Sequence, residues 1–338
     1  MKTPHVRILF CVCCLLGCWS ITLFCVEAKI VFCDGENICV MNDDGSGKRR
    51  LTDNTTVKDR RPRWSPDGTK IVFTRYMDLK NLHTSSELFI INADGTHLQR
   101  LTDNHLNEGS PSWSPDGQHI AFTSHRTGKH EIFVLDLATL AVTQITKGGA
   151  ASPDWSPDGT QIVYENFGDG VGLAQKSIYV MDADGQNPHP VVAAPPPNAP
   201  PTSGFFPRWS ADGQRIVYSE VQWLKEGDVE KIVVQRIGGA RRVITDINDR
   251  LGNEWLGTFV CWMEDDTAIL FGIERRDKPN PNYDIYRYTF NTQSLKRLTR
   301  GPGNQDWPDW IEGALSVSPQ RKITILWGEI KSPDDEHP

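Results

Sequence analysis

Short apolar runs separated by turn residues recur along most of the chain. Runs such as Leu88-Phe-Ile-Ile91 and Ile162-Val-Tyr164 are rich in β-branched and aromatic residues. Gly, Pro, Asn and Asp interrupt these runs roughly every eight to twelve positions, which is typical of short antiparallel strands and not of helical repeats. The pattern predicts an all-β fold.

One five-residue unit, Trp-Ser-Pro-Asp-Gly, precedes many of these runs. It begins at Trp64, Trp113 and Trp155, and recurs as Trp-Ser-Ala-Asp-Gly from Trp209. Its proline presets the first corner of a turn, its aspartate bonds to the local backbone, and its glycine takes a left-handed conformation. Each unit therefore predicts a hairpin. The structural repeat residues are Trp64, Pro66, Asp67, Gly68, Trp113, Pro115, Asp116, Gly117, Trp155, Pro157, Asp158, Gly159, Trp209, Asp212 and Gly213.

Two degenerate copies follow. The fifth begins at Trp262, and the sixth begins at either Trp310 or Val317. With Trp310 as the sixth, the tryptophans are 49, 42, 54, 53 and 48 residues apart. That spacing accommodates four short strands and their turns, as in a propeller blade. We therefore expect a six-bladed β-propeller of four-stranded antiparallel blades.

The ring is expected to close through its two ends. The chain after residue 28 starts with an apparent second strand at Ile30–Phe32, and the last repeat supplies a first strand. Pairing of these strands in one blade would remove two exposed sheet edges. The run from Ile323 to Trp327 has no place in this scheme.

The first 28 residues differ in kind, because an apolar run follows Lys2 and Arg7. With Val26 and Ala28 as small residues before a cleavage point, the segment predicts a signal peptide and a periplasmic or secreted protein. A retained membrane anchor and a lipid-anchored form through Cys18 are the alternatives. The domain boundaries are then residues 1–28 for the signal, 29–331 for the propeller and 332–338 for a tail.

Three of the eight cysteines lie beyond the signal: Cys33, Cys39 and Cys261. Cys33 and Cys39 flank a turn, so a disulfide between them is one interpretation. We favour small buried hydrophobes for all three, because no disulfide framework or metal-ligand spacing is present.

The charge of the chain limits the classes of partner that it is expected to bind. A net charge of −7, with no basic run, argues against nucleic-acid binding. With the signal removed, we expect no membrane span, and we expect a monomer. No cofactor is predicted; calcium is the one alternative, although the repeated aspartates lack the rest of a calcium loop and fit hairpin turns.

The Trp-Ser-Pro-Asp-Gly units, with Asn92-Ala-Asp-Gly95, resemble the TolB-like propeller family, also described as WD40-like or PD40 repeats. The resemblance covers nearly all of residues 29–312 and implies six blades. TolB carries an additional α/β domain before its propeller, and here the propeller follows the signal directly. The shared motifs are turn and core residues, so they imply a fold more than a function.

Family members also suggest catalytic roles. Oligogalacturonate lyases would need a metal-holding cluster of His and Gln at the channel mouth, for which His83, His125 and His130 are the nearest candidates. Peptidase relatives carry their nucleophile in a separate domain, and no Gly-x-Ser-x-Gly unit occurs here. We expect no catalytic residue and no metal site.

The candidate binding surface is the channel rim, formed by the loops and residues that precede each repeat tryptophan. It comprises Asp59, Arg60, Arg61, Asn107, Glu108, Ser110, Ser152, Glu254, Gln305 and Asp306. A proline-rich insertion, residues 187–201, is either a spacer between blades or a docking segment. The sequence thus predicts a non-enzymatic extracytoplasmic module that binds a protein or a glycan. A carbohydrate-active enzyme with a metal at the channel mouth and a purely structural envelope protein are the alternatives.

Overall fold

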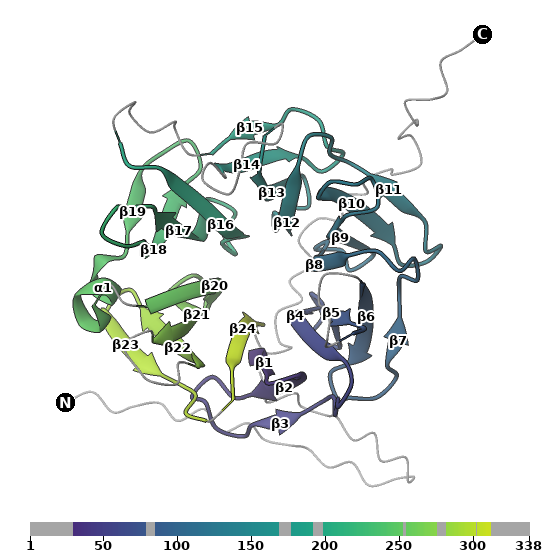
Figure 1. Ribbon diagram of the computed structural model, residues 1–338, viewed down its shortest axis with the longest axis horizontal. Coiled ribbons are helices and arrows are strands. Elements are labelled where there is room, and N and C mark those ends of the chain that lie inside the picture. Colours follow the sequence, from purple (N-terminus) through teal and green to yellow (C-terminus); the bar gives the residue numbers. More distant parts are fainter. Residues whose placement is uncertain are drawn as a thin grey trace, which may run out of the picture.

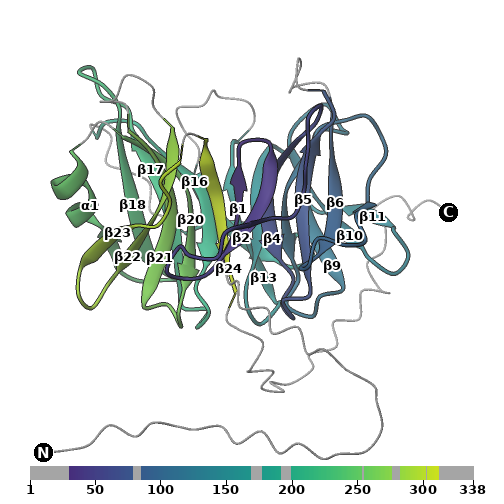
Figure 2. The ribbon, with the colours of Figure 1, turned by 90° about the horizontal axis from the view of Figure 1, so that it is seen from below.

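Six four-stranded antiparallel sheets are arranged as a ring around a central channel in the computed structural model (Figure 1). The structure describes residues 30–78, 85–168, 177–191, 199–252, 255–275, 282–301 and 303–311. Seen from the side, the strands run between two faces, so the loops gather on those faces (Figure 2). The six-bladed all-β prediction is confirmed.

Each blade contributes its first strand to the channel and its fourth to the outside. Blade 1 consists of β4 (Lys58–Trp64), β5 (Lys70–Tyr76), β6 (Ser86–Asn92) and β7 (Gln99–Arg100). Blade 2 consists of β8 (Glu108–Trp113), β9 (His119–Ser124), β10 (Glu131–Asp136) and β11 (Val142–Gln144). Blade 3 consists of β12 (Ala150–Trp155), β13 (Gln161–Asn166), β14 (Ser177–Asp182) and β15 (His189–Pro190). Blade 4 consists of β16 (Thr202–Trp209), β17 (Arg215–Gln222), β18 (Val229–Arg236) and β19 (Arg241–Val243). Blade 5 consists of β20 (Trp255–Met263), β21 (Ala268–Arg275), β22 (Tyr283–Thr289) and β23 (Ser294–Arg297).

Blade 6 closes the ring with strands from both ends of the described chain. Its order is β24 (Gln305–Trp310), β1 (Ile30–Asp34), β2 (Asn37–Met41) and β3 (Arg49–Arg50). Ile30 pairs with Trp310 and Asp34 with Gln305. The predicted closure is confirmed, and the sixth repeat begins at Trp310.

The repeated turns have the predicted chemistry. In the first, the Asp67 carboxylate accepts hydrogen bonds from the Ser65 hydroxyl at 2.6 Å and the Thr69 amide at 3.0 Å. Gly68 has φ +69°, in the left-handed region. Partial burial works to raise the pKa of Asp67, but the bonds from Ser65 and Thr69 outweigh it and hold the pKa below its ordinary value. The aspartate is thereby occupied as a turn residue.

In several blades, a threonine just after the outer strand is hydrogen-bonded through its hydroxyl to two consecutive residues of the third strand. We call this arrangement the threonine clamp. In blade 1 the Thr102 hydroxyl accepts from the Leu88 amide at 2.9 Å and donates to Glu87 at 2.6 Å. In blade 2, Thr146 makes the same two bonds with Ile132 and Glu131. The recurrent Leu-Thr and Ile-Thr endings of the sequence are therefore fixed by a buried hydrogen-bond network.

The hydrophobic core lies between neighbouring blades. Between blades 1 and 2, for example, Val72 and Leu88 share a cluster with Trp113, Ile120 and Phe122. A repeat tryptophan belongs to each of these clusters but one. In the cluster between blades 5 and 6, Trp310 is only partly buried and packs against the cluster. Each blade therefore depends on its neighbour to bury its apolar face.

Some details differ from the expectation. A short helix, α1 (Thr245–Leu251), follows β19 and buries Ile247. The insertion supplies the outer strand of blade 3 at His189–Pro190, because a two-residue edge strand tolerates a proline. Cys33 and Cys39 are unbonded and buried. They pair with Ile38 and Phe32, so they point to opposite faces of the hairpin.

Several predictions lie outside the described residues. These are the signal segment, Glu254, His83, residues 192–198 of the proline-rich insertion, the run from Ile323 to Trp327 and the tail. Within the described residues, no helix is long and apolar enough to cross a membrane.

Candidate functional site at the channel mouth

Each inner strand carries a β-bulge just before its tryptophan. In blade 1 the regular pairing of β4 with β5 breaks between Arg60 and Arg63. In blades 1 to 4 and in β24, the bulge contains a residue followed by proline. Proline is tolerated at a bulge because it has no N–H to donate to the hydrogen bonds between the strands. The residues before proline have positive φ: Arg61, Ser110, Ser152, Phe206 and Trp307. In blade 5, Val260 replaces the proline and pairs with Phe271, so the bulge lies one residue earlier.

These bulge residues, with Phe259, surround one mouth of the channel, which we call the mouth ring: Arg61, Ser110, Ser152, Phe206, Phe259 and Trp307. They line a cavity of about 40 Å³ together with the bulge prolines, Arg63, Arg208 and Val260. That volume holds a few water molecules or one small polar group.

The mouth ring is divided into an aromatic and a polar side. Phe206 lies edge-on to Trp307 with ring centroids 5.1 Å apart, and Phe259 stacks on Trp307. The Arg61 guanidinium lies 4.6 Å from the centre of the Trp307 ring, in cation–π geometry. Its Nη1 donates to the Ser110 hydroxyl at 2.8 Å. Arg61 therefore joins the two sides.

Below the mouth ring, four charged residues from four blades form ion pairs across the channel. Arg208 lies 3.2 Å from Asp154 and 3.1 Å from Asp309, and Arg63 pairs with the same two carboxylates. We call this set the ionic ring: Arg63, Asp154, Arg208 and Asp309. Each occupies the position before a repeat tryptophan, and Ser112 and Cys261 fill the two remaining blades.

The ionic ring has approximate two-fold symmetry. Blades 1 and 4 supply arginines, and blades 3 and 6 supply aspartates that accept from the Trp209 and Trp64 amides respectively, each at 2.9 Å. Burial raises the pKa of Asp154 to about 6, although Arg63 lowers it, and the neighbouring Asp309 raises it further. Burial also raises the pKa of Asp309. The charges balance, but the cost of desolvation is large.

The opposite mouth contains a larger cavity of about 350 Å³, lined by the six repeat tryptophans and floored by the ionic ring. Trp64, Trp113, Trp155, Trp209 and Trp262 are at most 8% exposed there. The Trp113 and Trp262 indoles donate to the carbonyl groups of Arg63 and Arg208. These tryptophans therefore hold neighbouring blades together.

The structure separates the predicted rim residues into two groups. Arg61, Ser110 and Ser152 line the mouth cavity. Asp59 and Glu108 are fully buried and form ion pairs with Arg75 and Arg126 inside their blades.

The remaining described rim residues are buried or partly buried. Arg60 is buried and donates to the Gly35 carbonyl, Gln305 is buried and donates to Asp34, and Asn107 is partly buried. Asp306 is also buried, and that burial raises its pKa to about 6 despite Arg60. A bulge places two residues opposite one, so it reverses the alternation of side chains along the strand.

Sequence reasoning missed the aromatic side and the ionic ring. The available signal was positional: the residue three before each tryptophan is Arg61, Ser110, Ser152, Phe206, Phe259 or Trp307. Aligning the repeats on tryptophan, and asking which position precedes proline, identifies the mouth ring.

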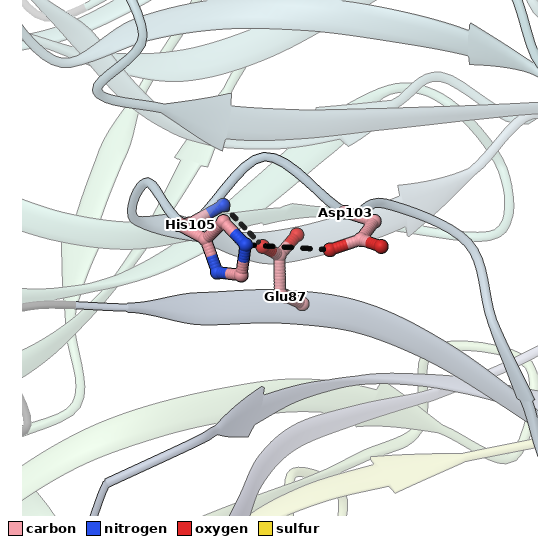
Figure 3. A group of neighbouring side chains, drawn as sticks. All are labelled: Glu87, Asp103 and His105. Atoms are coloured by element: carbon pink, nitrogen blue, oxygen red, sulfur yellow. Dashed lines mark hydrogen bonds and ion pairs between the residues drawn. The ribbon is translucent and has the colours of Figure 1, made fainter.

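One cluster of acidic and histidine side chains lies away from the channel, on blade 1. Glu87, Asp103 and His105 come close together at the outer part of the blade (Figure 3). Glu87 already accepts from Arg100 at 3.0 Å and from the backbone amides of Asn104 and His105. Because Glu131 makes equivalent contacts in blade 2 without a histidine, the contacts of Glu87 are those of a blade clamp.

Comparison with known proteins supports the fold. Residues 76–175 match a family profile described as the TolB beta propeller domain. TolB from Acinetobacter baumannii has a TM-score of 0.65 at 17% identity, over 85% of this chain and 67% of that one. Hydrazine synthase from Kuenenia stuttgartiensis has a TM-score of 0.65 at 15% identity, over 83% and 46% of the two chains. An oligogalacturonate lyase in complex with manganese has a TM-score of 0.54 at 14% identity, over 82% and 76%. No curated protein sequence matches.

Proposed function

Starting from a TolB-like six-bladed propeller, we propose that this protein is a non-enzymatic binding module whose mouth ring receives a segment of a protein partner. We further propose that it acts outside the cytoplasm, in the periplasm or after secretion, as its leader-like first 28 residues suggest. The remainder of the proposal depends on the chemistry of the channel mouth.

The composition of the mouth cavity carries the proposal. Its lining consists of arginines, serines, prolines, aromatic residues and one valine, with no Asp, Glu, His, Lys or Tyr among the described residues. An arginine remains protonated in proteins, so it is a poor general base. Aromatic and arginine side chains, in contrast, are the residues that dominate binding energy at protein interfaces.

The ionic ring supports a binding role, because it forms a floor at which an inserted segment would stop. The prolines of the bulges make the surrounding backbone stiff, so the site is organised before a partner arrives. Predicted rim residues Arg61, Ser110 and Ser152 are the ones that we propose contact the partner.

A metal-dependent lyase is the second candidate. It is supported by the likeness to a manganese-bound oligogalacturonate lyase and by the Glu87, Asp103 and His105 cluster. We rank it lower because Arg100 already pairs with both Glu87 and Asp103, at 3.0 and 2.6 Å. A bound cation would have to displace that guanidinium.

Site-specific photocrosslinking in cells tests the proposal. A benzophenone amino acid at position 206 places the probe in the mouth ring, and the same probe at Leu140, which is 48% exposed in a turn of blade 2, is the control. We expect a discrete protein adduct from position 206 and none from position 140. No adduct from position 206, or stoichiometric manganese in the purified protein with turnover of oligogalacturonate, would favour the enzyme.

A further inference from the structure

The mouth ring contains a cation, Arg61, to which the described part of the chain supplies no anionic partner. Arg63 and Arg208 each pair with both Asp154 and Asp309, so the four charges of the ionic ring cancel. Arg61 makes no ion pair with any residue that the structure describes. Among the residues whose positions are described, the Phe206 and Trp307 rings and the Ser110 hydroxyl are the groups that stabilise its positive charge.

The hydrogen bonds of Arg61 are also incomplete. Its Nη1 is bonded to Ser110, and its Nε is buried without a hydrogen-bond partner within the described residues. A buried, unsatisfied donor on a charged group is unfavourable, so the Arg61 guanidinium retains hydrogen-bonding capacity that the described residues do not use. The Ser152 hydroxyl lies in the same cavity lining and offers another donor.

We propose that the mouth ring is a carboxylate receptor, in which Arg61 binds an aspartate or glutamate side chain of the protein partner. This inference rests on the proposed function and names the group that the site recognises. A guanidinium can donate two parallel hydrogen bonds to a carboxylate, and the cation–π contact with Trp307 holds the Arg61 guanidinium at the cavity.

The dimensions of the site favour a carboxylate on a flexible side chain over a sugar acid. A pyranose ring binds by lying on an exposed aromatic face. Here Phe259 stacks on Trp307 and Arg61 lies over the same ring system, so the indole is already covered by other groups. The enclosed space of about 40 Å³ holds a carboxylate group, whereas a sugar ring would extend beyond it into the open mouth.

Acetate and acetamide are the probes for the first test, because they have the same shape and differ in charge. With ¹⁵N-labelled tryptophan in the full chain, the Trp307 indole signal is assigned by its absence in Trp307→Phe. At constant ionic strength, we expect saturable acetate-dependent shifts of this signal and no comparable shift with acetamide. No saturable acetate effect, or an equal effect of acetamide, would overturn the proposal.

Matched arginine variants then test whether Arg61 is the receptor. Arg61→Gln removes the charge, and Arg242→Gln removes another cation–π arginine, which lies 5.9 Å from the Phe290 ring centre and far from the channel. We expect acetate binding to weaken about tenfold or more in Arg61→Gln, and to be unchanged in Arg242→Gln. Equal binding to Arg61→Gln and wild type would contradict the assignment, and unchanged tryptophan spectra without ligand verify that both variants are folded.

Glucuronate distinguishes between an acidic side chain and a sugar acid as the source of the carboxylate. Binding no tighter than that of acetate supports an acidic side chain, whereas tenfold tighter binding would assign the site to a sugar acid instead. The proposed function is tested separately through the adduct at position 206. If that adduct forms equally with Arg61→Gln, the binding function stands and the carboxylate assignment fails.

Discussion

Arg208 Nη2 and Asp309 Oδ1 lie 3.1 Å apart although they belong to blades 4 and 6, which are not neighbours in the ring. The contact therefore spans the channel, and both side chains are at most 13% exposed. Ion pairs at such depth contribute little net stability when they are complete, but loss of one member leaves a buried charge unpaired.

Substitution of Arg208 by Met is accordingly expected to destabilise the protein by about 3 kcal/mol or more near neutral pH. Urea unfolding measures the change. The control is Arg50→Met, since Arg50 and Asp53 form an exposed pair whose loss should change stability by about 0.5 kcal/mol or less.

The double variant Arg208→Met/Asp309→Asn removes one charge of each sign from the ionic ring. We expect it to be less destabilised than the sum of the two single variants, because the charges balance again. Strictly additive losses would show that the four residues do not act as a coupled unit.

The pH dependence of the ionic ring follows from the pKa of Asp154, which burial raises to about 6. Since the folded pKa exceeds the ordinary value, the native state binds more protons than the unfolded state between about pH 4 and 6. The contribution of this group to stability is then greatest below that window and falls as the pH rises through it. The free energy of unfolding of Asp154→Asn, taken relative to that of wild type, should therefore increase by on the order of 2 kcal/mol between about pH 4 and 7.

Carboxyl ¹³C titration gives a direct measurement of the same pKa. In Asp309→Asn, the apparent pKa of Asp154 should decrease, because the charge of Asp309 raises it in the wild type. An unchanged or higher value would contradict the electrostatic account of the ring.

The threonine clamp of blade 1 provides a further prediction. Thr102→Val leaves the buried Leu88 amide without its side-chain acceptor and Glu87 Oε2 without the hydroxyl donor, while Glu87 Oε1 keeps its other donors. The expected loss is about 2 kcal/mol by thermal or urea unfolding. Thr143→Val, at an exposed position on the edge strand β11, is the isosteric control and should be nearly neutral. Similar losses in both variants would mean that the clamp is dispensable.

Substitutions at two glycines distinguish the energetic cost of backbone strain from that of close packing. Gly128 and Gly185 have φ +83° and +89°, but only Gly185 has a neighbour, Ile145 O, near its missing Cβ. Gly128→Ala should cost about 1 kcal/mol through strain alone, and Gly185→Ala at least about 2 kcal/mol more. Comparable unfolding midpoints for the two variants would argue against this packing effect.

The fold was predictable because the repeat residues each specify local structure. The Trp-Ser-Pro-Asp-Gly units predicted the hairpins, their spacing predicted blades, and the strand at Ile30–Phe32 predicted the closure. Helix α1 was missed because Thr245-Asp-Ile-Asn has weak helical propensity and stands where an outer strand ends.

The candidate site was only partly predictable. Asp59 and Glu108 were predicted at the rim by their place in the chain, and the structure buries both as partners of Arg75 and Arg126. The local backbone determines which way a side chain points, and one bulge reverses that direction. The ionic ring depends on contacts between blades that are far apart in sequence, so no local pattern reveals it.

The closing strand β24 has a consequence for the order of synthesis. Ile30 pairs with Trp310, which emerges from the ribosome 280 residues after it. Until then, β1 has an open edge that other chains can pair with. The blades between can form as they emerge, but the circle is completed only after translation of Trp310, so a nascent or truncated chain remains vulnerable to aggregation and proteolysis.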